Sequence, residues 1–286
     1  VSLMKVVRTY ATSANLGPGF DCLGICFDIY NEYTFEKSNK YELIGFDKDF
    51  LDPKNNLIIL AYEKVFEIKN KKLEYIKLTE VVKNIPNSRG LGSSASCIVA
   101  GILIADAILN NILDKDEIFQ IASSIEGHPD NVAPLIFGGF TCSFMDEKYY
   151  TVKLNVNEKL KFKVLIPPFE LKTSLARSVL PKSIQIKDAV FNMSHAIGMI
   201  QGIEKGDMEL IKISKKDVLH EPYRYQLIKG SNDVIALAEQ NNAVCMISGA
   251  GSTLLIISNK VLDITYQDWK VVDVDISNIG AYIYEK

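Results

Sequence analysis

The strongest chemical signal in the sequence lies at residues 86–96, which read PNSRGLGSSAS. They join a predicted strand, residues 75–85, to a predicted apolar helix, residues 94–109. Gly90 and Gly92 lack a Cβ, so the backbone there can turn sharply and approach a ligand closely. The free N–H groups and the dipole at the start of the next helix favour an anion. The segment predicts a site for a phosphate-bearing ligand, although such a loop on its own more often only caps a helix.

The kind of phosphate loop follows from what the segment contains. A Walker A loop needs a lysine after its second glycine, and neither glycine here is followed by one. Residues 90–95 satisfy the dinucleotide pattern G-x-G-x-x-A, which also needs an acidic residue that ends a strand about twenty positions later. Asp114 and Asp116 have that spacing but lie in a polar break between two predicted helices. The remaining interpretation is a loop that binds a nucleoside triphosphate, in which serine hydroxyls face the phosphates and a metal.

A second polar cluster occupies residues 13–24, directly after the first predicted strand. Three glycines and a proline constrain the backbone and present Asn15 and Asp21 from one tight loop. Either residue alone in a turn usually bonds its own backbone. The two residues together on one constrained loop indicate a binding site for an ammonium or hydroxyl group.

A third cluster, E-G-H-P-D-N at residues 126–131, places two carboxylates, an imidazole and an amide within six residues. Asp130 could simply cap the helix that follows. Capping does not explain why Glu126 and His128 share the same turn. A carboxylate near nucleotide phosphates is a suitable Mg²⁺ ligand, because Mg²⁺ takes one or two carboxylates together with phosphate oxygens.

Arginine is rare, with only four among 32 basic residues. Arg89 lies in the glycine loop, and Arg177 and Arg224 lie in polar segments of the second half, where two guanidinium groups could hold a substrate carboxylate. Surface salt bridges are the simpler interpretation of those two. The segment S-G-A-G at residues 248–251 lies between two predicted strands and, near a nucleotide, would provide a second backbone contact to it.

The elements that must position these clusters mix strands and helices without strict alternation, which predicts an α+β fold. The first half contains strands at 5–12, 25–35, 75–85, 140–145 and 149–154, and helices at 56–68, 94–109, 116–125 and 131–137. The second half contains strands at 161–166, 243–247, 253–258, 270–276 and 281–284, and helices at 174–179, 186–201, 207–213 and 231–240. A polar stretch at residues 155–159 predicts two domains, 1–156 and 157–286.

Composition excludes several classes of function. The net charge of −3 gives no reason to expect nucleic acid or an anionic membrane as partner, and the longest apolar runs are too short to span a bilayer. Five cysteines without C-x-x-C spacing predict free thiols in a reducing cytoplasm rather than a zinc site or disulfides.

Taken in order, these motifs resemble the GHMP small-molecule kinases. The opening S-A-N-L-G-P-G-F-D, the run E-G-H-P-D-N-V-A-P and the segment T-S-L-A-R-S-V-L-P are closest to the branch that acts on homoserine. The resemblance implies ATP-dependent phosphorylation of the side-chain hydroxyl of L-homoserine, a step of threonine synthesis. It also implies an N-terminal domain like domain 2 of ribosomal protein S5 and a ferredoxin-like C-terminal domain.

The resemblance carries residue roles with it. Ser94 and Glu126 would hold Mg²⁺; Asn15, Asp21, His128, Arg177 and Arg224 would bind homoserine, with Asp21 facing its ammonium and the arginines its carboxylate. The nucleotide would be bound by Asn56, Pro86, Asn87, Ser88, Arg89, Gly90, Leu91, Gly92, Ser93, Ser94, Ala95, Ser96, Gly249 and Gly251. Asn131, Asp130 and Asp21 are the predicted catalytic residues, and the resemblance leaves the assignment of a general base open.

One segment departs from the family pattern. Residues 259–269 are short and contain β-favouring residues, so the last crossover helix is expected to be truncated or lost. Two other functions stay open at this point: another GHMP kinase, with mevalonate as acceptor, and a catalytically silent relative that senses ATP and a metabolite. Family members often form homodimers, and the sequence does not decide whether this chain does.

Overall fold

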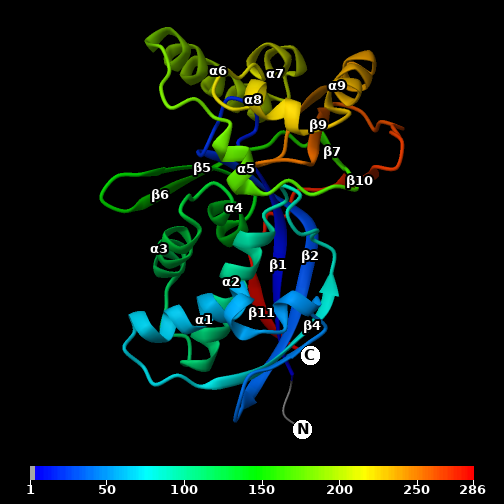
Figure 1. Ribbon diagram of the computed structural model, residues 1–286. Coiled ribbons are helices and arrows are strands. Elements are labelled where there is room, and N and C mark those ends of the chain that lie inside the picture. Colours follow the sequence, from blue (N-terminus) through cyan, green and yellow to red (C-terminus); the bar gives the residue numbers. More distant parts are fainter. Residues whose placement is uncertain (1–3) are drawn as a thin grey trace.

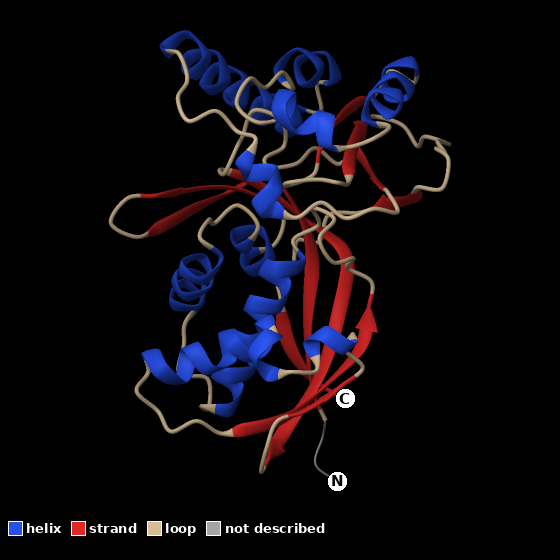
Figure 2. Ribbon diagram, in the orientation of Figure 1, coloured by secondary structure: helices blue, strands red, loops and turns tan. Residues whose placement is uncertain are grey.

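The computed structural model describes residues 4–286. Two sheets form the framework, each with helices on one side, and the predicted α+β class is confirmed (Figures 1 and 2). No helix in the described part of the chain combines the length and the apolar character needed to cross a membrane.

The first sheet has seven strands, with β11, β1, β2, β4 and β3 in that order and a β5–β6 hairpin paired to β2. Its strands are β1 (Lys5–Ala14), β2 (Leu23–Ser38), β3 (Glu42–Ile44), β4 (Tyr75–Lys83), β5 (Phe140–Met145), β6 (Tyr149–Leu154) and β11 (Tyr282–Glu285). Strand β2 pairs with β4 over its outer half and with β5 near its start. All pairs are antiparallel except β3–β4. The loop between β1 and β2 contains the Asn15–Asp21 cluster.

Four helices lie on one side of this sheet (Figure 1). They are α1 (Leu57–Ile68), α2 (Ser93–Ile108), α3 (Lys115–Glu126) and α4 (Val132–Phe137). Helix α2 is apolar on nearly every side and is buried, as such a helix must be. It packs closely on α1 at Gly101, where a Cβ would lie 2.1 Å from the Ile58 carbonyl oxygen. This packing holds the middle of α2 against α1, and the glycine loop leads into the same helix.

The second sheet is antiparallel, with the order β10, β7, β9, β8. Its strands are β7 (Lys161–Ile166), β8 (Val244–Ile247), β9 (Leu254–Ser258) and β10 (Lys270–Val274). Its helices are α5 (Thr173–Ser178), α6 (Ile186–Lys205), α7 (Met208–Ser214), α8 (Glu221–Arg224) and α9 (Ser231–Gln240), and three short 3₁₀ turns occupy Lys48–Phe50, Pro53–Asn55 and Tyr225–Leu227. Strand β9 lies between β7 and β8, which is the split arrangement of a ferredoxin-like sheet.

The expected loss of the last crossover helix is confirmed. Residues 259–269, all of them described, connect β9 to β10 as a loop, and Leu262, Ile264 and Trp269 bury their side chains from it. These three residues pack into the core that a helix would otherwise cover.

The two halves are joined more closely than a single boundary implies. Strand β11 returns to the first sheet and pairs with β1, although it belongs to the predicted second domain. One apolar cluster also includes Phe27 of β2 and Phe162 of β7, whose rings lie 5.8 Å apart. A division at residue 156, between β6 and β7, stays a prediction, and β11 does not follow it.

Candidate active site

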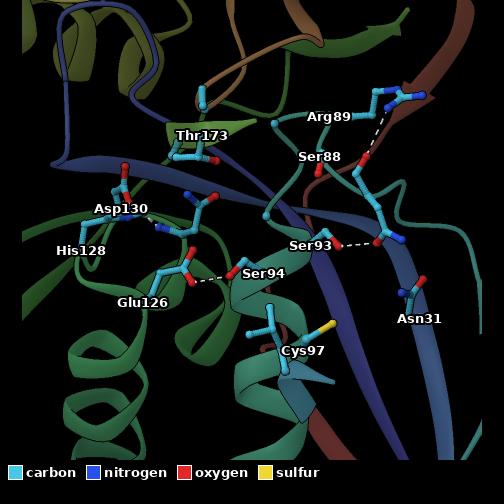
Figure 3. Close-up of a pocket in the computed structure, with 18 of the residues that line it drawn as sticks. Asn31, Ser88, Arg89, Ser93, Ser94, Cys97, Glu126, His128, Asp130 and Thr173 are labelled. Carbon is cyan, nitrogen blue, oxygen red and sulfur yellow. Dashed lines mark hydrogen bonds and ion pairs between the residues drawn. The ribbon is translucent and has the colours of Figure 1, made fainter. Parts of the chain in front are cut away.

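A cavity of about 230 Å³ is lined by residues from both halves of the chain. Figure 3 shows that side chains around it come from the glycine loop, the end of α3 with the turn that follows, and the start of α5. Asn15, Asp21, Glu126 and His128 reach it from the first half, and Arg177 and Arg224 from the second half. The three polar clusters of the sequence therefore meet at one place.

The glycine loop has the conformation that its glycines predict. Gly90 and Gly92 have φ values of 74° and 69°, in the left-handed region that side chains rarely adopt. A Cβ on Gly92 would lie 2.0 Å from Oγ1 of Thr12, and one on Gly90 would lie 2.2 Å from the Ser248 carbonyl oxygen. Gly92 is the N-cap of α2 and has no side chain to occupy the first N–H groups of that helix. These groups are suited to an anionic ligand.

Two serines at the start of α2 bond side chains from other segments (Figure 3). The Ser94 hydroxyl donates to Oε2 of Glu126 over 2.6 Å, and the Ser93 hydroxyl donates to Oδ1 of Asn87 over 2.9 Å. Burial raises the pKa of Glu126, although the bond from Ser94 acts in the opposite direction. Among the described residues, Glu126 forms no ion pair with a cationic side chain within 4.0 Å.

The Ser94–Glu126 pair fits Mg²⁺, because a hydroxyl and a half-buried carboxylate without a cationic partner stand beside the N-terminus where phosphates would lie. Nowhere in residues 4–286 do three or more His, Cys, Asp or Glu side chains gather into a metal site. Phosphate oxygens and water would have to complete the coordination, as they usually do for Mg²⁺.

Asp21 of the first half and Arg177 of the second half form an ion pair in the wall of the cavity. Oδ1 of Asp21 lies 2.7 Å from Nη2 of Arg177, and Oδ2 lies 3.0 Å from Nη1. Burial would lower the pKa of Arg177, but the hydrogen bond and charge of Asp21 outweigh it and raise that pKa. The residues predicted to take the ammonium and the carboxylate of one substrate are thus adjacent and paired with each other.

Arg224 is 1 % exposed and has no carboxylate partner among the described residues. Its Nε donates to the Ala176 carbonyl over 3.1 Å, and its Nη1 donates to the Gly249 carbonyl over 3.2 Å. Burial and the nearby charge of Arg177 lower the pKa of Arg224 to about 10. Buried charges are usually paired, so this guanidinium favours an anionic ligand in the cavity.

The side chain of Asn15 was predicted to bind the acceptor, but both of its polar atoms bond to the backbone of the protein itself. Its Oδ1 accepts from the Asp21 N–H over 2.9 Å, and its Nδ2 donates to the Gly249 carbonyl over 2.7 Å. Asn15 and Asp21 have φ values of 73° and 54°, so the amide stabilises a strained loop and ties it to the second half. One amide N–H is left for a ligand.

The turn after α3 is held by Asp130, which is 2 % exposed. Its Oδ1 accepts from Nδ1 of His128 over 2.7 Å and from the Asn131 N–H over 3.0 Å. Burial opposes the charged imidazole, but Asp130 and Glu126 raise the pKa of His128 above its ordinary value. Oδ1 of Asn131 accepts from the Thr12 hydroxyl over 2.8 Å, which fixes the amide at the cavity wall.

Arg89 and Asn56 line the cavity, but their side chains are engaged elsewhere. The Arg89 guanidinium bonds the carbonyls of Pro167 and Pro168 at 3.1 and 3.0 Å, so it connects the glycine loop to the second half instead of facing phosphates. Asn56 caps α1 by accepting from Ile58 N–H over 3.0 Å, and it donates to the Phe50 carbonyl over 3.0 Å. The predicted contact of Asn56 with a nucleotide base would have to use its remaining N–H.

Several predicted nucleotide-binding residues stand outside the cavity lining: Pro86, Leu91, Ala95, Ser96 and Gly251. Leu91 and Ala95 belong to the apolar core, and the Ser96 hydroxyl lies 2.7 Å from that of Thr9. The lining also includes residues that sequence analysis missed: Asn31, Tyr33, Phe46, Phe50, Glu80, Lys83, Cys97 and Thr173. Most come from strands and loops whose local sequence carries no motif.

Comparisons with known proteins show the family of the chain. Residues 56–139 match the family model of the GHMP kinases N terminal domain. The chain is 39% identical to a homoserine kinase of Clostridium beijerinckii, with 99% of each chain covered. A crystal structure of homoserine kinase from Cytophaga hutchinsonii superposes with a TM-score of 0.86 and 28% identity, over 98% of this chain and 97% of that one. A mevalonate kinase structure shares the fold at 15% identity and a TM-score of 0.69. The chain belongs to the homoserine kinase family of the GHMP kinases.

Proposed function

We propose that the protein transfers the γ-phosphoryl group of ATP to the side-chain hydroxyl of L-homoserine and forms O-phospho-L-homoserine for threonine biosynthesis. The names of its relatives support this acceptor. The single observation that carries the proposal is the Asp21–Arg177 pair beside the buried, unpaired Arg224.

This arrangement is complementary to an α-amino acid. An ammonium would face Asp21, and a carboxylate would face Arg177 and Arg224, where charge-assisted bonds are about twice as strong as neutral ones. The ammonium of the acceptor would replace Arg177 as the partner of Asp21. Its carboxylate would replace Asp21 as the partner of Arg177. The hydroxyl at the far end of the side chain would then be directed toward Asn131 and the glycine loop, which line the same cavity.

The phosphates of ATP would lie against the glycine loop and the N-terminus of α2. Mg²⁺, held by Ser94 and Glu126, would neutralise charge on the phosphates. Phosphoryl transfer depends mainly on positioning and charge stabilisation. The free N–H groups of α2 and the fixed amide of Asn131 supply both.

Asp130 is the carboxylate next to Asn131, and its bonds leave it poorly placed to receive the proton of the acceptor hydroxyl, which would pass to solvent as ADP leaves. Asp130 is buried, and its Oδ1 is bonded to His128 and to the backbone. We propose that Asp130 and His128 hold the turn that positions Asn131. Activity retained by Asp130→Asn would exclude a general-base role for Asp130.

The acceptor mevalonate is the alternative, and Asp21 argues against it. Mevalonate has a carboxylate but no ammonium, so the carboxylate of Asp21 would face a group that it does not complement. A catalytically silent sensor would not need Ser94, Glu126 and Asn131 to be placed as they are.

Cellular setting and assembly are also part of the proposal. Five unpaired cysteines support a reducing cytoplasm, and Cys22 among them is exposed. A homodimer is an expectation that comes from the family alone.

A coupled ADP-release assay tests the function directly. ATP and Mg²⁺ are supplied with L-homoserine, with mevalonate or with no acceptor. We expect turnover only with L-homoserine. Turnover with mevalonate, or binding of ATP with no turnover above the blank, would favour one of the alternatives.

A further inference from the structure

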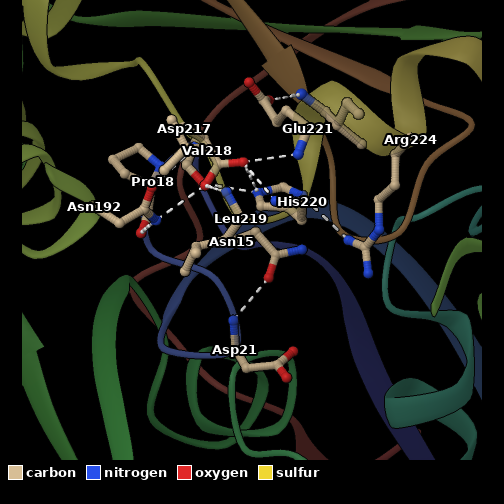
Figure 4. Close-up of polar contacts among 12 residues, drawn as sticks. Asn15, Pro18, Asp21, Asn192, Asp217, Val218, Leu219, His220, Glu221 and Arg224 are labelled. Atoms are coloured by element: carbon tan, nitrogen blue, oxygen red, sulfur yellow. Dashed lines mark hydrogen bonds and ion pairs between the residues drawn. The ribbon is translucent and has the colours of Figure 1, made fainter. Parts of the chain in front are cut away.

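His220 is fully buried and lies next to Arg224, which lines the cavity. Its Nε2 is 2.8 Å from the carbonyl oxygen of Gly17, in the loop that carries Asn15 and Asp21. Its Nδ1 is 3.3 Å from Nη1 of Arg224. Figure 4 shows the imidazole between that loop and the guanidinium.

These two contacts define the protonation of the ring. A carbonyl oxygen only accepts and a guanidinium only donates, so Nε2 carries the hydrogen and Nδ1 carries a lone pair. The ring is therefore neutral. Burial lowers the pKa of His220, in agreement with this state. The carboxylate of Asp217, whose Oδ2 lies 3.7 Å from Nε2, opposes this shift without reversing it, and the charge of Arg224 lowers the pKa further.

The backbone around His220 is fixed by Asp217 (Figure 4). Oδ2 of Asp217 accepts from the N–H groups of His220 and Glu221 over 2.8 and 2.7 Å. Oδ1 accepts from Nδ2 of Asn192 over 3.0 Å, and the same amide donates to the Pro18 carbonyl over 2.9 Å. The start of α8 and the loop before Asp21 are therefore held in one hydrogen-bonded unit.

Phe20 joins this unit through contacts with His220 and with both arginines of the site. Its ring stacks on His220 with centroids 5.2 Å apart. Cζ of Arg224 lies 5.2 Å from the same ring, and Cζ of Arg177 lies 5.7 Å from it. Both guanidinium groups thus rest on the aromatic side chain that His220 supports, which fixes their spacing.

We propose that His220 is a positioning residue, whose neutral imidazole joins the acceptor-binding loop to Arg224 so that Asp21 and Arg224 keep the separation that an α-amino acid needs. The inference rests on the proposed function, because it concerns the same acceptor. His220 itself touches neither substrate. Substitution of His220 should therefore affect acceptor binding alone.

Two substitutions separate this role from a general packing role. His220→Phe keeps an aromatic ring against Phe20 but loses both hydrogen bonds, and we expect the KM for L-homoserine to rise about tenfold. The KM for ATP and kcat should stay within about twofold, since the glycine loop is unaffected. His220→Gln offers an N–H to Gly17 and an oxygen to Arg224 without a titratable ring, and should bring the KM for homoserine back to near the wild-type value.

His195 provides a matched control. It stacks on Phe191 of the same helix and bonds the Phe191 carbonyl over 2.8 Å, outside the cavity lining. His195→Phe should leave both KM values unchanged. If His220→Phe raises neither KM, or raises both alike, or if His220→Gln fails to restore homoserine binding, the positioning role is wrong.

A substrate-free readout distinguishes this inference from the proposed function. Nitrogen-15 NMR of the unliganded protein should show His220 as the neutral Nε2–H tautomer, and the Arg224 Nε–H resonance should shift in His220→Phe but not in His220→Gln. An imidazolium or an Nδ1–H tautomer would overturn the inference. A wild-type protein that shows the expected tautomer but does not phosphorylate homoserine would instead contradict the proposed function.

Discussion

Asp21 and Arg177 stand 156 residues apart in the sequence and form a bidentate ion pair of 2.7 and 3.0 Å at the cavity. The pair connects the loop after β1 to helix α5, so it also joins the two halves of the site. An amino-acid acceptor carries both complementary charges and could replace each partner of the pair. Binding of the acceptor would then alter the contact between the two halves.

Asp21→Asn tests the ammonium contact. The amide keeps the size of the side chain but loses its charge, so we expect the KM for L-homoserine to rise at least tenfold, in line with about 1.5–3 kcal/mol for a hydrogen bond to a charged group. With 4-hydroxybutyrate, which lacks the ammonium, the same substitution should change KM far less. Steady-state kinetics on both acceptors measures this difference.

The control for Asp21 is Asp263→Asn, an exposed aspartate in the loop between β9 and β10. It should leave both acceptors unaffected. If Asp21→Asn raises the KM for homoserine and for 4-hydroxybutyrate equally, Asp21 does not bind the ammonium.

Glu126→Gln tests the metal role. Removal of the carboxylate should lower kcat by about a hundredfold or more, the range found when one charge-stabilising group is lost. The Mg²⁺ concentration for half-maximal activity should rise as well, whereas ATP binding without Mg²⁺ should change little. A titration of activity against Mg²⁺ measures both, with exposed Glu147→Gln as control. If the variant depends on Mg²⁺ concentration as the wild type does, Glu126 is not a metal ligand.

Gly92→Ala tests the glycine loop. The added Cβ would meet the Thr12 hydroxyl at 2.0 Å, in a left-handed backbone that already disfavours alanine. Gly127→Ala is the matched control, because Gly127 also has a positive φ but has nothing within 4 Å of an added Cβ. We expect Gly127→Ala to lower the free energy of unfolding by about 1 kcal/mol and Gly92→Ala by roughly 2–4 kcal/mol. Denaturant unfolding of both variants measures the difference between the two losses of unfolding free energy. Equal losses would mean that the contact with Thr12 is relieved without an energetic cost.

His128 gives stability a predictable pH dependence. Its pKa in the folded chain lies above the ordinary value of 6.5, so the folded chain binds more protons than the unfolded chain in that window. The contribution of the charged ring is complete below pH 6.5 and is lost as pH rises through the folded-state pKa. Urea unfolding between pH 5.5 and 9 should therefore show the gap between wild type and His128→Gln narrowing as pH rises. Asp130→Asn should remove most of this trend, and a gap that widens with pH would contradict the assignment.

Local sequence patterns predicted most elements well, because helix and strand periodicity depends on near neighbours. The strands at 140–145, 149–154 and 161–166 have the predicted bounds. Helix α8 was not predicted, since it is a single turn that contains a proline. The return of β11 to β1 could not be predicted either, because strand pairing depends on contacts across the whole chain.

The site shows the same division between local and distant information. Glycine-rich and acidic motifs predicted where ligands would gather, and the structure brings Ser94, Glu126, Asp21, Arg177 and Arg224 to one cavity. The partners of individual side chains were not predictable. Arg89 turns to the carbonyls of Pro167 and Pro168, which lie 78 and 79 residues away. His220 shows no motif of its own, and its side-chain partner Gly17 comes from a distant element that the local sequence does not connect to it.

The most direct measurement is phosphorus-31 NMR of the wild-type protein with ATP, Mg²⁺ and L-homoserine. The account predicts a phosphomonoester resonance that grows in step with ADP and is absent when homoserine is omitted. ADP that appears with inorganic phosphate and no phosphomonoester, or no consumption of ATP at all, would contradict it.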